Sequence, residues 1–516
     1  MKIKTGSKKT YFLFLIIGLG MILNLTSATY TGATSTTLKV AIASEPDTMD
    51  PTTTKYRASS LIVLDNINDT LVDLDWETGK ASPGIASWEV KDNNKVFEFT
   101  INKGIKFTSG DRLTAQDIEF SHNRVYKMNA QYRNYLTNLD KVEVIDDDTI
   151  RFVFKEQNIL FLIAGASSLN IVSKSYYDRV GEAEFLEHPA GTGPYKLVEW
   201  KLGQYIDLEA NEDYWGEKPR VKQVRILFTA EPTTRITMLQ AGEVDMVLDT
   251  PWDQVPELEE AGFKIWGRPG PPTLSLRIHT RNSHVPWYDK RVRQAFAYAI
   301  DRKAIVEKMF FGIPNVYAWL APTEVGYDST LKPYPYDPAK AKQLLTEAGY
   351  PKGFEMPLYY PTATIVAGIR DMVEAVSLYL SQVNIKCNVM GLEALKFMEK
   401  LRNAHSDVNA EFISLSPAGI SDTRDPSETL LVCFGTEGAT SMYSNPEADA
   451  LIQQIMQTFD DNQRGELIKQ FYRMMQEEMP IVPMLSNVSV YAMKTNIDYE
   501  PKRPFHVLVL HKVKVN

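Results

Sequence analysis

The seven histidines are the first residues to consider for catalysis or metal binding. They stand at His122, His188, His279, His284, His405, His506 and His511. None belongs to an H-E-x-x-H motif and no two lie four residues apart, so a hydrolytic zinc site of that kind is not indicated. The histidines also form no dense cluster that would favour nickel.

Motifs for nucleophilic catalysis and phosphate binding are also missing. The run Gly165–Leu169 lacks the second glycine of a G-x-S-x-G elbow, and Gly191–Gly193 is followed by Pro-Tyr instead of a phosphate-cradling helix. Three acids at Asp146–Asp148 lack the spacing and the glycine of an EF-hand loop and are interpreted as a solvated turn. We therefore predict no catalytic residue, no bound metal and no cofactor.

The most informative stretch, 188–249, consists of elements that would position a site. Leu197–Trp200 and Tyr205–Ala210, joined through Gly203, predict a β-hairpin with Ile206, Leu208 and Ala210 on its buried face. Pro232 opens a short helix that Gly242 ends, and Val244–Leu248 predicts a strand.

The same stretch carries ordered motifs: G-T-G-P-Y at 191–195, N-E-D-Y-W-G at 211–216 and R-x-x-x-L-x-x-G-E-V-D at 235–245. Their order and spacing resemble the solute-binding proteins of bacterial ABC importers, specifically the oligopeptide/dipeptide/nickel-binding family (family 5). The alternative is an ordinary strand-turn-helix unit of an unrelated domain. The resemblance implies an α/β, two-lobe periplasmic binding protein fold (type II-like, cluster C) with an extra subdomain in the first lobe.

Composition agrees with an ordinary globular protein of two or three domains. The chain has 516 residues, 44% apolar and 23% charged. Its formal charge of −9 becomes −13 once the four lysines of residues 1–35 are set aside, which argues against nucleic acid or an anionic membrane as partner. Those lysines precede an apolar run, Tyr11–Leu25, and small residues, which predicts a secretory signal peptide. A retained helical anchor is the alternative. No cysteine occurs before Cys387, so a lipid-anchored N-terminus is not expected.

The domain prediction follows the resemblance and the texture of the chain. Residues 1–35 form the signal peptide; 36–56 with 188–270 and 487–516 form the core of lobe I, 57–187 its extra subdomain, and 271–486 lobe II. At Pro269–Pro272 the P-G-P-P run predicts a break in regular structure where the chain crosses between lobes. Residues 286–312 predict one long helix, and Asp337-Pro338 begins another.

The resemblance also suggests binding residues. Peptide-binding members carry a D-x-x-[D/E]-P pattern whose first acid meets the peptide α-ammonium, and this pattern maps onto Asp422, with Asp425-Pro426 completing it. A helix cap or loop contact is the alternative for Asp422. Gly419 replaces the tryptophan that many members place three residues earlier, and the loop before Arg370 lacks the arginine that dipeptide binders use for the ligand carboxylate.

Four further residues are predicted to contact solute. Arg277 and His279 share one face of a strand, which would be either ligand-facing or solvated. Glu45 follows the first strand and would face ligand or stand in an exposed turn, and Tyr135 completes the set. The two cysteines, Cys387 and Cys433, would form a disulfide or remain separate buried thiols.

Together these observations predict a non-catalytic, monomeric periplasmic protein without a lipid anchor. It would close on a small solute by hinge motion and deliver it to an inner-membrane ABC permease. A di- or oligopeptide is the favoured solute; nickel or a metal chelate, a sugar or another amine-bearing solute are alternatives. A secreted hydrolase, and a receptor or chaperone-like role without transport, are the competing functions.

Overall fold

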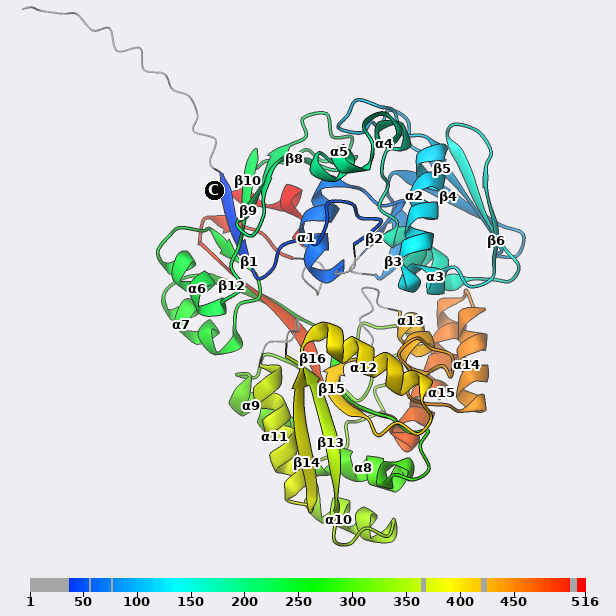
Figure 1. Cartoon of the computed structure of the whole chain (residues 1–516), viewed down its shortest axis with the longest axis vertical. Helices are drawn as coiled ribbons and strands as arrows, with labels where there is room; N and C mark the ends of the chain where they lie inside the picture. The colour runs from blue at the N-terminus through cyan, green and yellow to red at the C-terminus, as the bar shows by residue number, and fades with distance from the viewer. Residues whose placement is uncertain (1–36, 55–56, 76–77, 363–367, 419–424, 502–507) are drawn as a thin grey trace, which may run out of the picture. The chain divides into compact units, whose positions relative to one another are not determined.

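The structure of the protein is a computed structural model. It describes residues 37–516 apart from 55–56, 76–77, 363–367, 419–424 and 502–507 (Figure 1). In this part of the chain, no helix has both the length and the apolar character needed to cross a membrane.

A mixed sheet of ten strands runs through the described residues in the order β14-β13-β15-β12-β16-β11-β1-β10-β9-β8 (Figure 1). Its strands are β1 (Leu38–Ile42), β8 (Tyr195–Lys201), β9 (Tyr205–Ala210), β10 (Gln223–Phe228), β11 (Met246–Val247), β12 (Lys264–Ile278), β13 (Phe354–Pro361), β14 (Ile385–Leu392), β15 (Ile413–Pro417) and β16 (Ile481–Met493). β1 pairs in parallel with β10 and β11, whereas β8, β9 and β10 are antiparallel neighbours. The long antiparallel pair β12–β16 connects the two ends of this sheet.

Smaller sheets belong mainly to the segment 57–187. They comprise β2 (Val72–Asp75) with β3 (Lys80–Pro83), β17 (Ile497–Asp498) with β18 (Lys514–Val515), and a four-stranded sheet of β4 (Ala86–Lys91), β5 (Val96–Ile101), β7 (Thr149–Phe154) and β6 (Leu139–Val144). Phe97, Phe99 and Ile101 of β5 are buried, as their alternation predicts.

Helices connect and cover these sheets (Figure 1). They are α1 (Arg57–Ile67), α2 (Ala115–Met128), α3 (Ala130–Tyr135), α4 (Lys174–Val180), α5 (Glu182–Glu187), α6 (Pro232–Gln240), α7 (Val255–Glu260), α8 (Lys290–Ala299), α9 (Arg302–Met309), α10 (Pro338–Glu347), α11 (Ile369–Ser381), α12 (Ala394–Ser406), α13 (Ser427–Thr429), α14 (Pro446–Met456) and α15 (Asp461–Glu478). Two π-helical turns, η1 (Phe161–Gly165) and η5 (Leu430–Phe434), follow asparagine- and proline-containing segments.

Local sequence signals account for many of these boundaries. The predicted hairpin is β8–β9, with Ile206, Leu208 and Ala210 buried on one face. The Asp337 side chain accepts the Lys340 N–H at 2.8 Å and so caps α10. These predictions are confirmed.

Other boundaries differ from the predictions. The expected long helix over 286–312 is wrong, because the Asp301 carboxylate accepts the Ala304 N–H at 2.9 Å and starts a second helix, α9. The P-G-P-P run does not interrupt the strand. It lies inside β12, where the pairing with β16 shifts register around Pro269 and Pro272. The strand expected over Val244–Leu248 is only the two-residue β11.

Both cysteines are free in this structure, so the separate thiols of the two alternatives are present. Cys433 is buried, and burial raises the pKa of the half-buried Cys387 thiol to about 11. The Cys387 thiol is therefore protonated near neutral pH.

Separate apolar cores correspond to different stretches of the chain. One contains side chains from β12–β16 and helices α8–α11, α14 and α15, a second lies within 71–171, and a third joins β1 and β8–β10 to the C-terminal residues. Leu431, Met456 and Phe459 pack against the core of 71–171, and the Phe97 and Phe459 ring centroids lie 6.4 Å apart. The segment 57–187 is thus in direct contact with α14 and η5.

Candidate functional site

The G-T-G-P-Y motif has a packing role. A Cβ on Gly191 would lie 1.8 Å from the Ile67 carbonyl oxygen, and one on Gly193 would lie 2.6 Å from the Ile67 carbonyl carbon. Between them, the Thr192 hydroxyl accepts the Asp69 N–H at 3.3 Å. Only glycine permits the strand entry to approach the end of α1 this closely.

The N-E-D-Y-W-G motif contacts the same place. Trp215 Nε1 donates to Asp69 Oδ2 at 2.8 Å, and the Tyr214 hydroxyl donates to Asp69 Oδ1 at 3.1 Å. Burial raises the pKa of the Asp69 carboxyl to about 6 despite these donors. The motifs that make the sequence recognisable therefore stabilise the α1–β2 junction.

Asp422, the residue predicted to bind the peptide α-ammonium, and Gly419 lie outside the described residues. Asp425 is the first described residue after them, and its Oδ2 accepts from Arg464 Nη2 at 2.7 Å. Asp425 Oδ1 also accepts the Ser427 N–H at 2.9 Å, which begins α13. Asp425 is thus a structural anchor three residues after Asp422.

Tyr135 forms a contact between distant segments. From the end of α3, its hydroxyl donates to Glu428 Oε1 on α13 at 2.6 Å, and both residues are buried. A second polar bridge nearby joins Gln457 Nε2 to Glu156 Oε2 at 3.1 Å. These bonds and the Phe97–Phe459 contact connect 57–187 with the chain that follows the 419–424 loop.

Glu45 binds the β8–β9 hairpin in this structure. Its Oε2 accepts the Gly203 N–H at 2.9 Å and Trp200 Nε1 at 3.4 Å. The carboxylate therefore ties the end of β1 to the hairpin turn, and its contact with solute stays a prediction.

Arg277 and His279 lie in the protein interior, so the solvated strand face is wrong. Their exposed fractions are 3% and 0%, and Leu276 and Ile278 on the opposite face of the strand are buried as well, so both faces are covered. Arg277 donates to the backbone carbonyls of Pro417 and Thr440, and burial lowers the pKa of both the guanidinium and the His279 imidazole, the latter to about 4. In this conformation neither side chain reaches a solute, and their ligand role stays a prediction.

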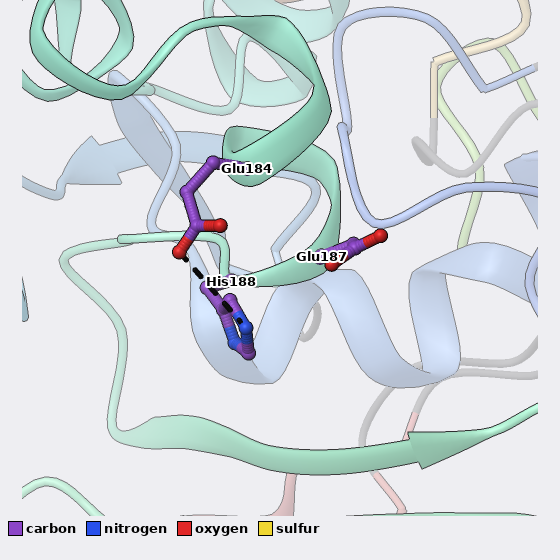
Figure 2. A group of neighbouring side chains, drawn as sticks. All are labelled: Glu184, Glu187 and His188. Atoms are coloured by element: carbon purple, nitrogen blue, oxygen red, sulfur yellow. Dashed lines mark ion pairs between the residues drawn. The ribbon is translucent and has the colours of Figure 1, made fainter.

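Figure 2 shows one group in the described residues whose side chains are close enough to share a metal ion: Glu184, Glu187 and His188 at the end of α5. Their candidate ligand atoms lie within 4.8 Å of one another, and Glu184 faces His188 at 4.0 Å. All three residues are exposed on one short helix, where such i,i+4 pairs are common surface features. The group is remote in sequence from Asp422 and shares none of the predicted binding residues.

Sequence reasoning missed Arg464 and Glu428. Both are buried charged residues whose partners come from other elements, 39 residues away for Arg464–Asp425 and 293 for Tyr135–Glu428. A charged residue on the apolar face of α15, between Asp461 and Ile468, was the available signal for Arg464.

The comparison with known families decides the assignment. The family described as "Bacterial extracellular solute-binding proteins, family 5 Middle" matches residues 81–440. The chain belongs to this family. As a family 5 solute-binding protein it is the substrate-binding component of an ABC importer, as the resemblance implied.

Individual relatives extend over nearly the whole chain. Heme-binding protein A of Haemophilus influenzae is 27% identical over 496 residues, covering 90% of this chain and 88% of that protein. The dipeptide-binding protein of Pseudomonas aeruginosa is 27% identical over 495 residues, covering 88% and 89%. The structure of the periplasmic binding protein DppA from Helicobacter pylori with the peptide STSA superposes with a TM-score of 0.80 at 23% identity, covering 93% of this chain and 98% of that one. The predicted α/β periplasmic binding protein fold is confirmed.

Proposed function

We propose that this family 5 protein captures a di- or oligopeptide and delivers it to an inner-membrane ABC permease. The family match over 81–440 carries the proposal, because the matched region includes the D-x-x-D-P pattern at 422–426. A relative named for dipeptide binding, similar over 88% of the chain, supports a peptide as solute. The family's function involves no reaction, and we propose none here.

The proposed lobes follow the division 36–56 with 188–270 and 487–516, 57–187, and 271–486. The separate cores of 71–171 and of lobe II support it, whereas Ile62 and Ile67 of α1 pack in the core of β1 and β8–β10. The long strands β12 and β16 would be the connections about which the lobes rotate, since they join the two ends of the ten-stranded sheet. Register shifts near Pro269 and Pro272 would allow that rotation without loss of the flanking pairs.

Closure is the proposed mechanism. A solute that contacts both lobes favours the closed form by its difference in affinity for the two forms. The Tyr135–Glu428 bond joins 57–187 to the chain directly after the 419–424 loop, so it would form on closure. Solute binding at that loop and closure would then support each other.

Within the cleft, we propose that Asp422 accepts the peptide α-ammonium. The buried Asp425–Arg464 pair would hold the loop in place at its exit. A charge-assisted bond in a poorly hydrated cleft is strong, and removal of one partner is costly. Gly419 stands in the sequence where many members of the family have tryptophan.

The experiment is calorimetric titration of a dipeptide and its N-acetylated form into wild-type protein and Asp422→Asn. We expect the substitution to weaken the free-amine peptide at least about tenfold, or about 1.4 kcal/mol. The acetylated peptide lacks the ammonium and is expected to bind both proteins alike. Equal binding of the free-amine peptide to both would remove Asp422 from the site, and a nickel chelate or sugar that binds more tightly would replace the peptide as solute.

We further propose a monomeric, periplasmic protein from which residues 1–35 are cleaved during export, with no lipid attached. Intact mass of the exported protein tests the cleavage, and native mass spectrometry reports both the oligomeric state and any co-purified solute. Incubation of the purified protein with the bound peptide should return the peptide unchanged. Turnover by the purified protein would instead favour the hydrolase.

A further inference from the structure

A cavity of about 650 Å³ lies between two segments that are distant in sequence, 134–160 and 431–457. This volume lies within the range of about 300–1,000 Å³ typical of small-molecule sites. One wall comes from the segment between α3 and η1, and the other from η5 and α14. Figure 1 shows α3 and α14 as neighbours, and Met456 of α14 packs against the core of 71–171.

Part of the cavity lining is apolar. It is formed by Leu160, Leu431, Val432, Ile452 and Met456. Leu431 and Met456 are only half-buried, so part of their apolar surface remains available to a ligand. Burial of hydrocarbon against these side chains would contribute roughly 25 cal/mol per Å² of apolar surface removed from water, which favours a ligand with an apolar body.

The rim carries negative charge. Glu156, Glu437 and Asp449 line the cavity, and none of its described lining residues is lysine, arginine or histidine. Glu156 and Glu437 are exposed; Glu156 accepts from Gln457 Nε2 at 3.1 Å, and Asp449 accepts from the Thr436 hydroxyl at 2.6 Å. A cation with an apolar body therefore matches both parts of the cavity, and an anion would meet repulsion.

The lining differs from the predicted peptide site. Of the predicted binding residues that the structure describes (Glu45, Arg277, His279 and Tyr135), none lines the cavity. The lining does include Asn158, whose amide donates to the Tyr135 carbonyl oxygen at 3.0 Å, so the cavity adjoins the Tyr135–Glu428 contact.

We propose that this cavity is a second binding site, which takes a small organic cation: a primary ammonium on a hydrocarbon or aromatic body. Because its two walls come from different segments, an occupant that touches both favours their association. Through linkage, such an occupant would raise the affinity for the transported solute. The site itself does not depend on the identity of that solute.

The first test is calorimetric titration of phenethylammonium into the full mature chain, with 2-phenylethanol and 3-phenylpropionate as neutral and anionic probes. We expect the ammonium to bind about tenfold more tightly than the alcohol, and the carboxylate to bind least. Equal binding of all three probes, or none at millimolar concentration, would overturn the proposal.

Two matched substitutions locate the site. Gln453 and Gln454 are exposed neighbours on α14, and only Gln453 lines the cavity. Gln453→Trp should fill the cavity and weaken the ammonium probe at least about tenfold, whereas Gln454→Trp should leave it unchanged. The same loss in both variants, or in neither, would place the probe elsewhere.

The substitution Glu437→Gln tests the role of charge. Its control is Glu447→Gln, at an exposed acid at the start of α14 that does not line the cavity. Glu437→Gln should weaken the ammonium about three- to tenfold and leave the alcohol unchanged, since only one exposed charge is lost. An equal effect on both probes would contradict charge recognition.

Asp422→Asn separates this site from the proposed function. The ammonium probe should bind this variant as it binds the wild type, and should still bind when the transported solute is saturating. Loss of the probe in Asp422→Asn, or its displacement by solute, would show that it occupies the solute cleft and would overturn the second site. If no peptide binds but Gln453→Trp still removes the probe, the peptide proposal fails and the second site stands.

Discussion

Arg464 donates from Nη2 to Asp425 Oδ2 at 2.7 Å, and the two side chains are only 3% and 4% exposed. The same guanidinium donates to the Thr458 and Phe459 carbonyls and to Asp461. Burial opposes the charged form of Arg464, but Asp425 and Asp461 outweigh it and raise the pKa of the guanidinium, which remains charged. The buried Arg464 guanidinium therefore connects Asp425, the first described residue after 419–424, with the turn between α14 and α15.

The substitution Asp425→Asn should destabilise the protein strongly. It leaves the Arg464 charge buried without its buried partner, and loss of one member of such a pair costs about 3–5 kcal/mol. Urea unfolding measures the change. Asp461→Asn is the control, because Asp461 pairs with the same guanidinium at 2.7 Å but is 43% exposed, and its loss should cost less than about 1 kcal/mol. Equal losses for both variants would contradict a special role for the buried pair.

Tyr135→Phe should weaken solute binding while leaving the separate cores folded. The hydroxyl donates to the buried Glu428 carboxylate at 2.6 Å, and a hydrogen bond to a charged group contributes about 1.5–3 kcal/mol. Since the bond joins segments that the proposed closure brings together, its loss should appear as roughly a tenfold weaker solute affinity by calorimetry.

The control for that substitution is Tyr126→Phe, at a tyrosine that is 42% exposed. It should leave the affinity unchanged. Unaltered affinity in Tyr135→Phe would mean that the bond contributes equally to open and closed forms.

Local sequence patterns predicted local structure well. The β8–β9 hairpin and the cap at Asp337 depend on residues within a few positions of one another, so their spacing was sufficient. The same reasoning missed the cap at Asp301 because an apolar helical pattern continues across it.

Long-range contacts were not predictable in this way. Period-2 alternation gave the strand around Arg277 one polar face, but in the fold both faces are buried: Leu276 on one face is 0% exposed and Arg277 on the other is 3% exposed. Arg464 meets Asp425 only after α15 packs on the core, so neither residue's spacing revealed the pair. The prediction of Asp422 thus depends on a family motif, whereas the neighbouring Arg464–Asp425 pair could be recognised only in the folded structure.

Glu45→Gln tests whether this carboxylate serves the hairpin or the solute. Its Oε2 accepts the Gly203 N–H at 2.9 Å, and an amide oxygen can keep that bond but without the charge. We expect a loss of about 1 kcal/mol in unfolding free energy and an unchanged solute affinity. A tenfold loss of affinity with unchanged stability would instead assign Glu45 to the solute site.

The pH dependence of stability should carry a contribution from Asp69. Burial raises the pKa of its carboxyl to about 6 in the folded protein from an ordinary value near 3.8, so the folded state binds more protons than the unfolded state between these pH values. The contribution of this group to stability is therefore greatest below about pH 4 and falls as pH rises through 6, by roughly 2–3 kcal/mol in total.

Urea unfolding of wild type and Asp69→Asn at several pH values between 4 and 7 isolates the effect, because residue 69 of the variant cannot titrate. The difference in unfolding free energy between the two proteins should shift against the wild type as pH rises, with a matching change in Trp215 fluorescence, since Trp215 Nε1 donates to Asp69 at 2.8 Å. A difference that stays constant across this range would mean that Asp69 is ionised throughout, held so by its Trp215 and Tyr214 donors.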